Sequence, residues 1–160
     1  MTPSPEEQFI ETLGLIFQAE GVPRISGQVL AYLVLAGDSR SLTEIAQALG
    51  VSKASVSTNV RQLEARGATE RDSRIGSRQD LWRAVADPHH RVLGTMAERF
   101  DRNADRMQDI AAGFAGDPDK QQRVGAFGDF YRQSAKFLRT WFDAVGDGSE
   151  PGDIIRKAND

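Results

Sequence analysis

The sequence predicts a mainly α-helical protein with one small β-hairpin. Apolar residues recur at helical spacing over most of the 160 residues. Several of these stretches begin at a capping residue followed by proline or glutamate, and end at glycine. Between residues 68 and 84, by contrast, two short extended segments flank a tip of glycine and serine, which is the pattern of a hairpin.

Two helices are expected before residue 40. The run Ser4-Pro5-Glu6-Glu7 supplies an N-cap, a proline at the first helical position and a glutamate that can complete a capping box. The apolar pattern of this helix continues until Gly21. A second helix is expected over Ile25–Leu35, with Gly37 ending it.

The segment Ser41–Arg66 predicts two short helices joined by a tight turn. Ser41 and Glu44 can form a capping box at the start of the first helix. Gly50 can end that helix in the left-handed conformation, and Ser52 can cap the second. The pattern is that of a helix-turn-helix.

The second helix of this motif has a narrow apolar stripe formed by Val56, Val60 and Leu63. With that stripe turned inward, the outward side carries hydroxyl, amide and basic groups, with no acid before Glu64. Such groups read base edges in a DNA major groove or contact phosphate. An ordinary helical hairpin would share the pattern and leave this side solvated. The candidate DNA-binding residues of this segment are Ser52, Lys53, Ser55, Thr58, Arg61 and Gln62.

The predicted hairpin follows directly, with strands expected at 68–71 and 79–84. Arg74 and Arg78 lie at its tip, and Arg71 and Arg83 flank it. Arginine is favoured in a narrow minor groove, where the negative potential is enhanced. A hairpin with arginines at its tip, directly after such a helix, indicates a winged helix-turn-helix. Arg74 and Arg78 are therefore added to the candidate DNA-binding residues.

Two long helices are expected to follow, starting at Asp87-Pro88 and Asp117-Pro118, with Gly146 ending the second. Large apolar residues recur along the last helix, and a small winged domain could not cover them. We expect the same face of a second chain to pack on them, together with the first helix. The alternative is that other helices of the same chain cover them. The apolar residues concerned are Phe127, Tyr131, Leu138 and Trp141.

The predicted organisation therefore has four parts. Residues 1–21 form an N-terminal dimerisation helix, 22–86 the winged helix-turn-helix domain, 87–146 the C-terminal dimerisation helices, and 147–160 a flexible acidic tail.

Charge and composition narrow the functional classes. The net charge is −3, yet residues 51–84 carry seven basic and four acidic residues, a local +3 that leaves −6 elsewhere. A basic face on an acidic body favours a selective nucleic-acid binder. The absence of cysteine excludes disulfides and thiol nucleophiles and agrees with a reducing cytoplasm. Neither a signal peptide nor a membrane span is expected.

No catalytic, cofactor or metal site is expected. The two histidines, His89 and His90, are adjacent, so on a helix they point about 100° apart and do not readily share a metal. A solvated pair explains them better. No Gly-rich phosphate loop or nucleophile elbow is present. An enzyme is therefore not predicted.

Residues 9–86 resemble the MarR family of bacterial transcriptional regulators, and most closely its GbsR-type branch. The resemblance lies in FIETLGLIFQAEGVPRISGQVLAYLVL, SLTEIAQALGVSKASVSTNVRQLEARG and SRIGSRQDLWRA. It implies a homodimeric regulator that usually represses, dimerises through its terminal helices and contacts DNA through the second motif helix and the wing.

The resemblance also implies a small-molecule effector held between the winged domain and the dimer helices. GbsR-like relatives are associated with choline sensing, and an aromatic cage would recognise a quaternary ammonium group. Tyr32, Trp82 and Phe100 are the candidates, although aromatics at helical spacing are more often core residues.

The sequence thus predicts a ligand-responsive repressor that binds double-stranded DNA at a near-palindromic operator. The alternative is a winged-helix module that contacts protein and has no operator of its own. The wing-tip arginines favour DNA, because a protein-contacting wing has little need of them.

Overall fold

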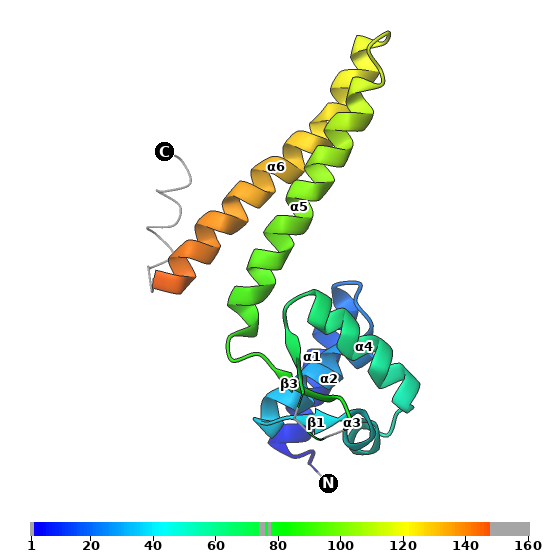
Figure 1. Cartoon of the computed structure of the whole chain (residues 1–160), viewed down its shortest axis with the longest axis vertical. Helices are drawn as coiled ribbons and strands as arrows, with labels where there is room; N and C mark the ends of the chain where they lie inside the picture. Colours follow the sequence, from blue (N-terminus) through cyan, green and yellow to red (C-terminus); the bar gives the residue numbers. More distant parts are fainter. Residues whose placement is uncertain (1, 74–75, 77, 148–160) are drawn as a thin grey trace. The chain divides into compact units, whose positions relative to one another are not determined.

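The computed structural model describes residues 2–73, 76 and 78–147, and the chain divides into two compact units, Met1–Pro88 and His89–Asp160. The first unit contains four helices and three short strands among the described residues (Figure 1). Its elements are α1 (Pro5–Ala19), α2 (Arg24–Ala36), β1 (Arg40–Ser41), α3 (Leu42–Leu49), α4 (Lys53–Ala65), β2 (Thr69–Asp72) and β3 (Leu81–Ala84). The predicted fold class, mainly helical with a small hairpin, is confirmed.

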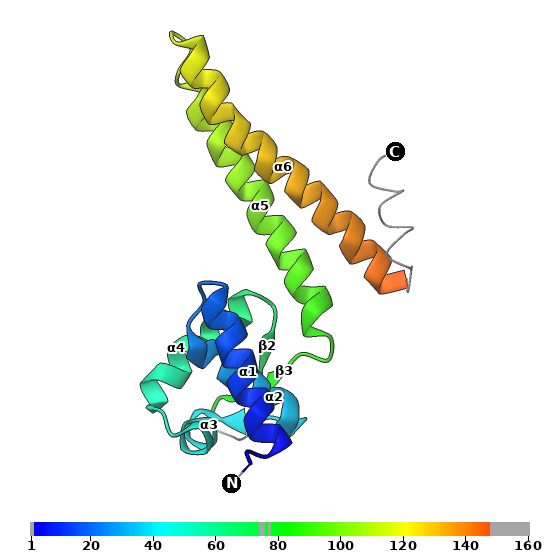
Figure 2. The same ribbon diagram turned by 180° about the vertical axis from the view of Figure 1, so that it is seen from behind.

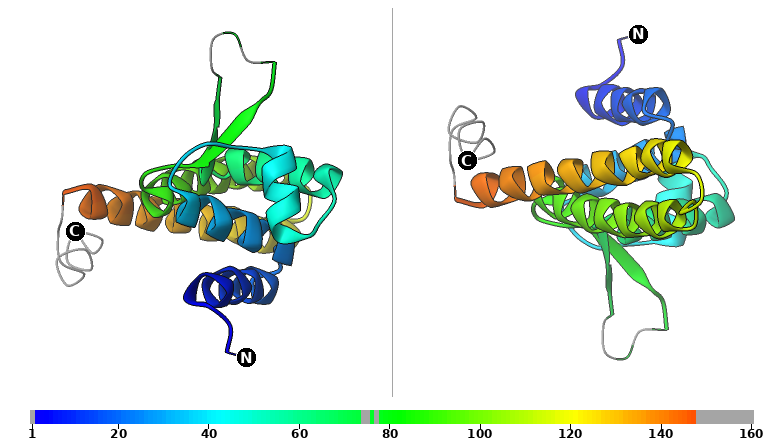
Figure 3. Two further views of the ribbon diagram at one scale, coloured as in Figure 1. Left: turned by 90° about the horizontal axis from the view of Figure 1, so that it is seen from below. Right: turned by 90° about the horizontal axis from the view of Figure 1, so that it is seen from above.

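The three strands form one antiparallel sheet in the order β1-β3-β2. The predicted hairpin is β2 and β3, and it projects away from the helices of its unit (Figure 3). Strand β1 was not predicted, because two residues are too few to show an alternating pattern. Its residues Arg40 and Ser41 pair with Trp82 and Leu81 of β3, which attaches the wing to the start of α3.

The predicted helix boundaries rest on local contacts that the structure contains. Capping boxes are present at Ser4 with Glu7 and at Ser41 with Glu44. Gly37 and Gly50 end α2 and α3 in the left-handed conformation, with φ of 69° and 65°. Each of these contacts joins residues within one helical turn, and this is why the sequence predicts them.

The capping box of α3 makes the stability of the protein sensitive to acid. The backbone N–H of Ser41 donates to Glu44 Oε2 at 2.7 Å, and the Glu44 N–H donates to Ser41 Oγ at 3.1 Å. The hydrogen bond from the Ser41 backbone lowers the pKa of the Glu44 carboxyl, and the Ser41 side chain adds to this. A lowered pKa contributes stability above the unfolded pKa, and that contribution is lost as the pH falls.

We therefore expect Glu44→Gln, which keeps a capping oxygen but does not titrate, to be less stable than the unmodified chain near neutral pH. The difference in unfolding free energy should close between about pH 5 and about pH 3, as the carboxyl becomes protonated. Denaturant unfolding across this range measures it. A difference that is the same at both ends would contradict this role for the Glu44 charge.

The core of the first unit is formed by the inward faces of α2, α3 and α4 together with β3. The predicted stripe of α4, Val56, Val60 and Leu63, is buried, as is Ile45 of α3. Other fully buried side chains are Val29, Leu33 and Trp82.

Helices α1 and α2 approach closely through two glycines. A Cβ placed on Gly27 would lie 2.4 Å from the carbonyl oxygen of Leu13 and 2.8 Å from Cα of Gly14. Both atoms belong to the α1 backbone, so neither can move aside as a side-chain tip could. Gly27 is thus what allows α1 to lie against α2.

Gly27→Ala should therefore destabilise the protein by about 1–3 kcal/mol or more, as expected for overpacking against backbone. Gly125→Ala, in α6, is the matched control, since a Cβ there meets nothing closer than 3.9 Å. It should be neutral or stabilise by up to about 1 kcal/mol, through helix propensity. Chemical denaturation measures both variants, and equal effects would exclude the proposed close approach.

The second unit is an antiparallel pair of long helices, α5 (Pro88–Ala112) and α6 (Pro118–Asp147), which lie side by side (Figures 1 and 2). Both predicted starts are confirmed. Gly146 does not end α6 as predicted, because the described part of the helix continues through it to Asp147, and a single glycine does not prevent a helix from continuing. Of the predicted tail, residues 147 to 160, only Asp147 is described, and it belongs to α6; residues 148 to 160 lie outside the described residues.

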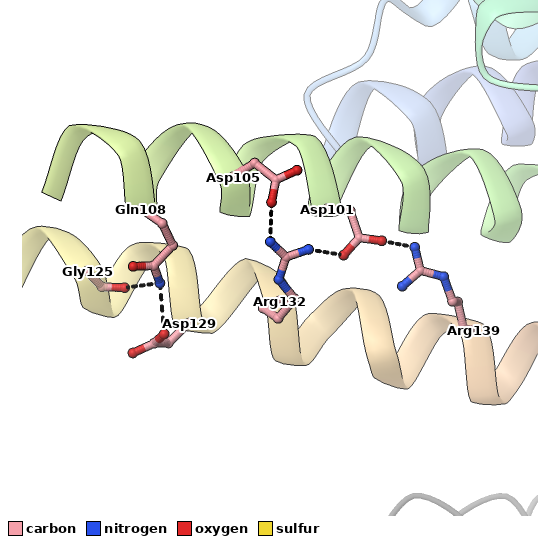
Figure 4. Close-up of polar contacts among 7 residues, drawn as sticks. All are labelled: Asp101, Asp105, Gln108, Gly125, Asp129, Arg132 and Arg139. Carbon is pink, nitrogen blue, oxygen red and sulfur yellow. Dashed lines mark hydrogen bonds and ion pairs between the residues drawn. The ribbon is translucent and has the colours of Figure 1, made fainter. Parts of the chain in front are cut away.

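Small residues and a ladder of polar contacts hold α5 and α6 together. Ala97, Ala104 and Ala111 recur every seven residues along α5 and are all buried. On the adjacent surface, Arg132 pairs with Asp101 at 2.7 Å and with Asp105, and Arg139 also pairs with Asp101 (Figure 4). Gln108 Nε2 donates to Asp129 Oδ1 at 2.9 Å in the same series (Figure 4). These contacts fix the register of the hairpin.

The apolar face of α6 differs from the predicted one. Leu138 is buried within its own unit, so the prediction that it needs an external partner is wrong. Four aromatic side chains of α6 are exposed, and two of them, Phe127 and Trp141, belong to the predicted face. They form the aromatic stripe, Phe127, Phe130, Phe137 and Trp141, with exposed fractions of 65%, 61%, 48% and 40%. Their spacing of three, seven and four residues places them on one side of α6, beside the buried side that carries Leu138.

Among the residues that the structure describes, no helix combines the length and the hydropathy that spanning a bilayer requires.

Candidate nucleic-acid interface

Helix α4 is held so that its predicted polar side faces away from the core. Ser52 caps it by accepting a hydrogen bond from the Ser55 N–H at 3.1 Å. With the apolar stripe buried, Lys53, Arg61 and Gln62 are exposed. Ser52 and Thr58 are exposed as well, and Ser55 is half-buried. The Thr58 hydroxyl donates to the Ala54 carbonyl at 3.2 Å, so its oxygen remains able to accept.

The burial of one polar residue of α4, Asn59, was not predicted. Asn59 is 7% exposed, and its Oδ1 accepts a hydrogen bond of 2.6 Å from the hydroxyl of Ser26, which is 1% exposed on α2. Asn59 Nδ2 donates to the Ser55 carbonyl at 2.8 Å. The sequence pattern gave no signal for this, because asparagine is usually exposed and its partner lies 33 residues away.

The wing is also joined to α4 by a buried polar contact. The Thr69 hydroxyl, on β2, donates to the carbonyl oxygen of Val60 at 3.0 Å. Thr69 itself is 2% exposed and pairs with Ala84 of β3. The base of the hairpin and the middle of α4 are therefore in direct contact.

The two arginines that flank the wing are engaged with acidic side chains. Arg83 contacts Glu70, its cross-strand partner, at 2.7 Å. Arg71 lies 3.6 Å from Asp80, and its guanidinium sits 4.9 Å from the centre of the Trp82 ring. These pairs stabilise the hairpin and engage two of the seven basic residues counted between residues 51 and 84. Arg78 is exposed, whereas Arg74 lies outside the described residues.

The candidate effector residues lie in both units. Trp82 is 1% exposed in the sheet, beneath Arg71, and Tyr32 is half-buried on α2. Phe100 belongs to the second unit, where its ring meets Tyr131 edge-on at 5.3 Å. Each of the three aromatic side chains therefore packs, at least in part, against residues of its own unit.

The expectation of a solvated histidine pair holds for His89, which is exposed, but is wrong for His90. The ring of His90 stacks on that of Phe142, with centroids 3.8 Å apart, and its Nε2 lies 3.0 Å from the Phe142 carbonyl oxygen. This pair joins α5 to α6. Across the described part of the chain, no three His, Asp or Glu side chains gather as a metal ion would need.

Comparison with known proteins agrees with this geometry. A family model described as MarR family matches residues 20–75. The chain is 30% identical over 124 residues to the HTH-type transcriptional regulator MmpR5 of Mycobacterium tuberculosis (strain ATCC 25618 / H37Rv), covering 73% of this chain and 72% of that protein. It is also 32% identical over 82 residues to the protein YvaV of Bacillus subtilis (strain 168), covering 51% and 46% of the two chains.

A solved structure described as the crystal structure of a transcriptional regulator has the same fold, with a TM-score of 0.81. It is 22% identical and covers 90% of this chain and 99% of its own. The family match spans α2 to β2, which includes the whole helix-turn-helix, and the relative MmpR5 extends the similarity over most of the chain. The protein belongs to the MarR family of transcriptional regulators, with a DNA-binding winged helix-turn-helix.

Proposed function

We propose that this protein is a homodimeric, ligand-responsive repressor that binds a near-palindromic operator. The observation that carries the proposal is the orientation of α4. Its apolar stripe is buried, and its opposite side presents exposed hydroxyl, amide and basic groups. On this proposal, Thr58, Gln62 and Ser55 face base edges in the major groove, and Arg61 faces phosphate or a base.

The start of α4 and the wing supply the remaining DNA contacts. Ser52 and Lys53 lie at the helix N-terminus, where backbone N–H groups and the helix dipole favour a phosphate. Arg78, exposed in the wing, contacts the DNA backbone or enters the minor groove, together with Arg74. Arg71 and Arg83 are not assigned to DNA, because acidic partners already hold them.

The aromatic stripe of α6 supports the homodimer. Four aromatic side chains exposed along one helix form an apolar surface of the kind that soluble proteins cover with a partner. A second copy presents the same stripe, so a two-fold axis buries both at once. Two winged domains related by that axis would read half-sites about one DNA turn apart, roughly 34 Å.

Membership of the GbsR-type branch, a cytoplasmic location and a small-molecule effector complete the proposal. The branch and the effector rest on the resemblance of the three sequence stretches given above, and the location agrees with the absence of cysteine. The effector would be a quaternary ammonium compound, which aromatic side chains recognise. The dimerisation role of α1 is proposed on the same basis, and is consistent with the exposure of its Phe9, Leu15 and Ile16.

The experiment that tests the DNA-binding part is selection of sites by the full chain from a pool of randomised duplexes. We expect one near-palindromic consensus to be enriched. Affinity for the selected site should fall steeply as salt rises, because cations are released from the DNA. An absence of duplex affinity even at low salt would contradict the proposal and favour the protein-interaction module.

A further inference from the structure

Two buried polar contacts reach the middle of α4 from different elements. Ser26 of α2 donates to Asn59 at 2.6 Å, and Thr69 of β2 donates to the carbonyl oxygen of Val60 at 3.0 Å. Asn59 and Val60 are consecutive, so the two contacts meet α4 at the same level. Together they link this turn of the helix to α2 and to the wing.

These contacts constrain α4 in a way that its apolar stripe does not. Burial of Val56, Val60 and Leu63 is non-directional, and it tolerates a small rotation of the helix. A hydrogen bond weakens steeply when its distance or angle changes. The Asn59 amide is itself anchored by its bond to the Ser55 carbonyl at 2.8 Å, so its oxygen is held toward Ser26.

The constraint bears directly on the outward side of the same helix. Thr58 precedes Asn59, and Gln62 lies three residues further on, so their directions are set by the rotation of this turn. At a radius of about 5–6 Å, a rotation of about 20° moves a side chain by roughly 2 Å. Recognition requires placement within about 0.5 Å and 10–20°.

We propose that Ser26, Asn59 and Thr69 are positioning residues for DNA recognition. They fix the rotation of α4 relative to α2 and the wing, and so align Thr58 and Gln62 with base edges. The inference rests on the DNA contacts proposed for α4. It assigns sequence discrimination partly to three buried residues that do not touch DNA.

The first test uses Thr69→Val in the full chain. Valine keeps the shape of threonine, and the Val60 carbonyl keeps its hydrogen bond within the helix. Two duplexes serve as probes: the site that the unmodified chain selects from a randomised pool, and an unrelated duplex of equal length. We expect the ratio of the two affinities to fall about five- to tenfold, about 1–1.4 kcal/mol. Affinity for the unrelated duplex should stay within about twofold, since phosphate contacts are unchanged.

The matched control is Thr140→Val in α6. Its hydroxyl also donates to a backbone carbonyl, that of Lys136 at 3.1 Å, but this bond lies within one helix of the other unit and joins no two elements. The affinity ratio should remain that of the unmodified chain. A Thr69→Val protein that also keeps this ratio would contradict the positioning role of the Thr69 hydrogen bond.

The second test separates positioning from stability. Ser26→Ala alone leaves the Asn59 oxygen buried without its donor, which should lower the melting temperature. Combining it with Asn59→Leu removes both polar partners, and should recover much of the melting temperature. If the pair positions α4, the affinity ratio stays low although stability returns.

A double variant that recovers both the melting temperature and the full ratio would overturn the inference, because the pair would then serve stability alone. A different result is expected if the proposed DNA-binding function itself is wrong. In that case the unmodified chain itself selects no site from the pool, and the positioning role is excluded with it.

Discussion

Replacing Phe130 and Phe137 with aspartate should convert the protein to a monomer and lower its affinity for the selected operator by several orders of magnitude. Both side chains are largely exposed on α6, at 61% and 48%, so the hairpin core does not depend on them. Charged groups in the aromatic stripe would have to be desolvated in a dimer, which is strongly unfavourable. A monomer makes half the contacts and releases half the counterions.

Mass in solution and operator affinity measure the two effects. The matched control is Gln121→Asp with Gln122→Asp, which adds the same charge to exposed positions of α6 that lie away from the aromatic stripe. The control should remain dimeric and bind normally. A Phe130→Asp/Phe137→Asp protein that stays folded and monomeric, yet binds as tightly as the unmodified chain, would contradict coupling between dimerisation and operator binding.

The second large effect concerns how α4 and the wing divide recognition. Gln62→Ala should reduce discrimination against a substituted base by about 1–3 kcal/mol, because an amide can make two hydrogen bonds to one base. Its consensus should become degenerate at the position that Gln62 contacts. Arg78→Ala should instead weaken binding to all duplexes by similar factors, and reduce the salt dependence by about one ion.

Site selection and salt titration with each variant distinguish the two roles. Arg106→Ala in α5 is a control for the loss of one exposed positive charge. It should change neither the consensus nor the salt dependence. An Arg78→Ala protein with full affinity and a changed consensus would show that the wing, and not only α4, reads sequence.

The sequence by itself determined the features that depend on neighbouring residues. The helix starts at Pro5, Leu42 and Lys53 follow from serine caps, and the ends of α2 and α3 follow from glycine. Each cap satisfies backbone groups within one turn, so the residues responsible are adjacent in the chain. The buried stripe of α4 was predictable for the same reason, since its period is that of the helix itself.

Only the tertiary structure decided the features whose partners are distant in sequence. Asn59 is polar, and it is buried because Ser26 comes from another helix. Strand β1 exists because β3 pairs with it, and α1 lies close to α2 because Gly27 meets the backbone of Leu13 and Gly14. Along α6, helical spacing predicted one broad apolar surface. Packing against α5 buries Leu138 of that surface and leaves Phe130 and Phe137 exposed. Periodicity specifies which residues share a face, whereas burial depends on which element covers that face.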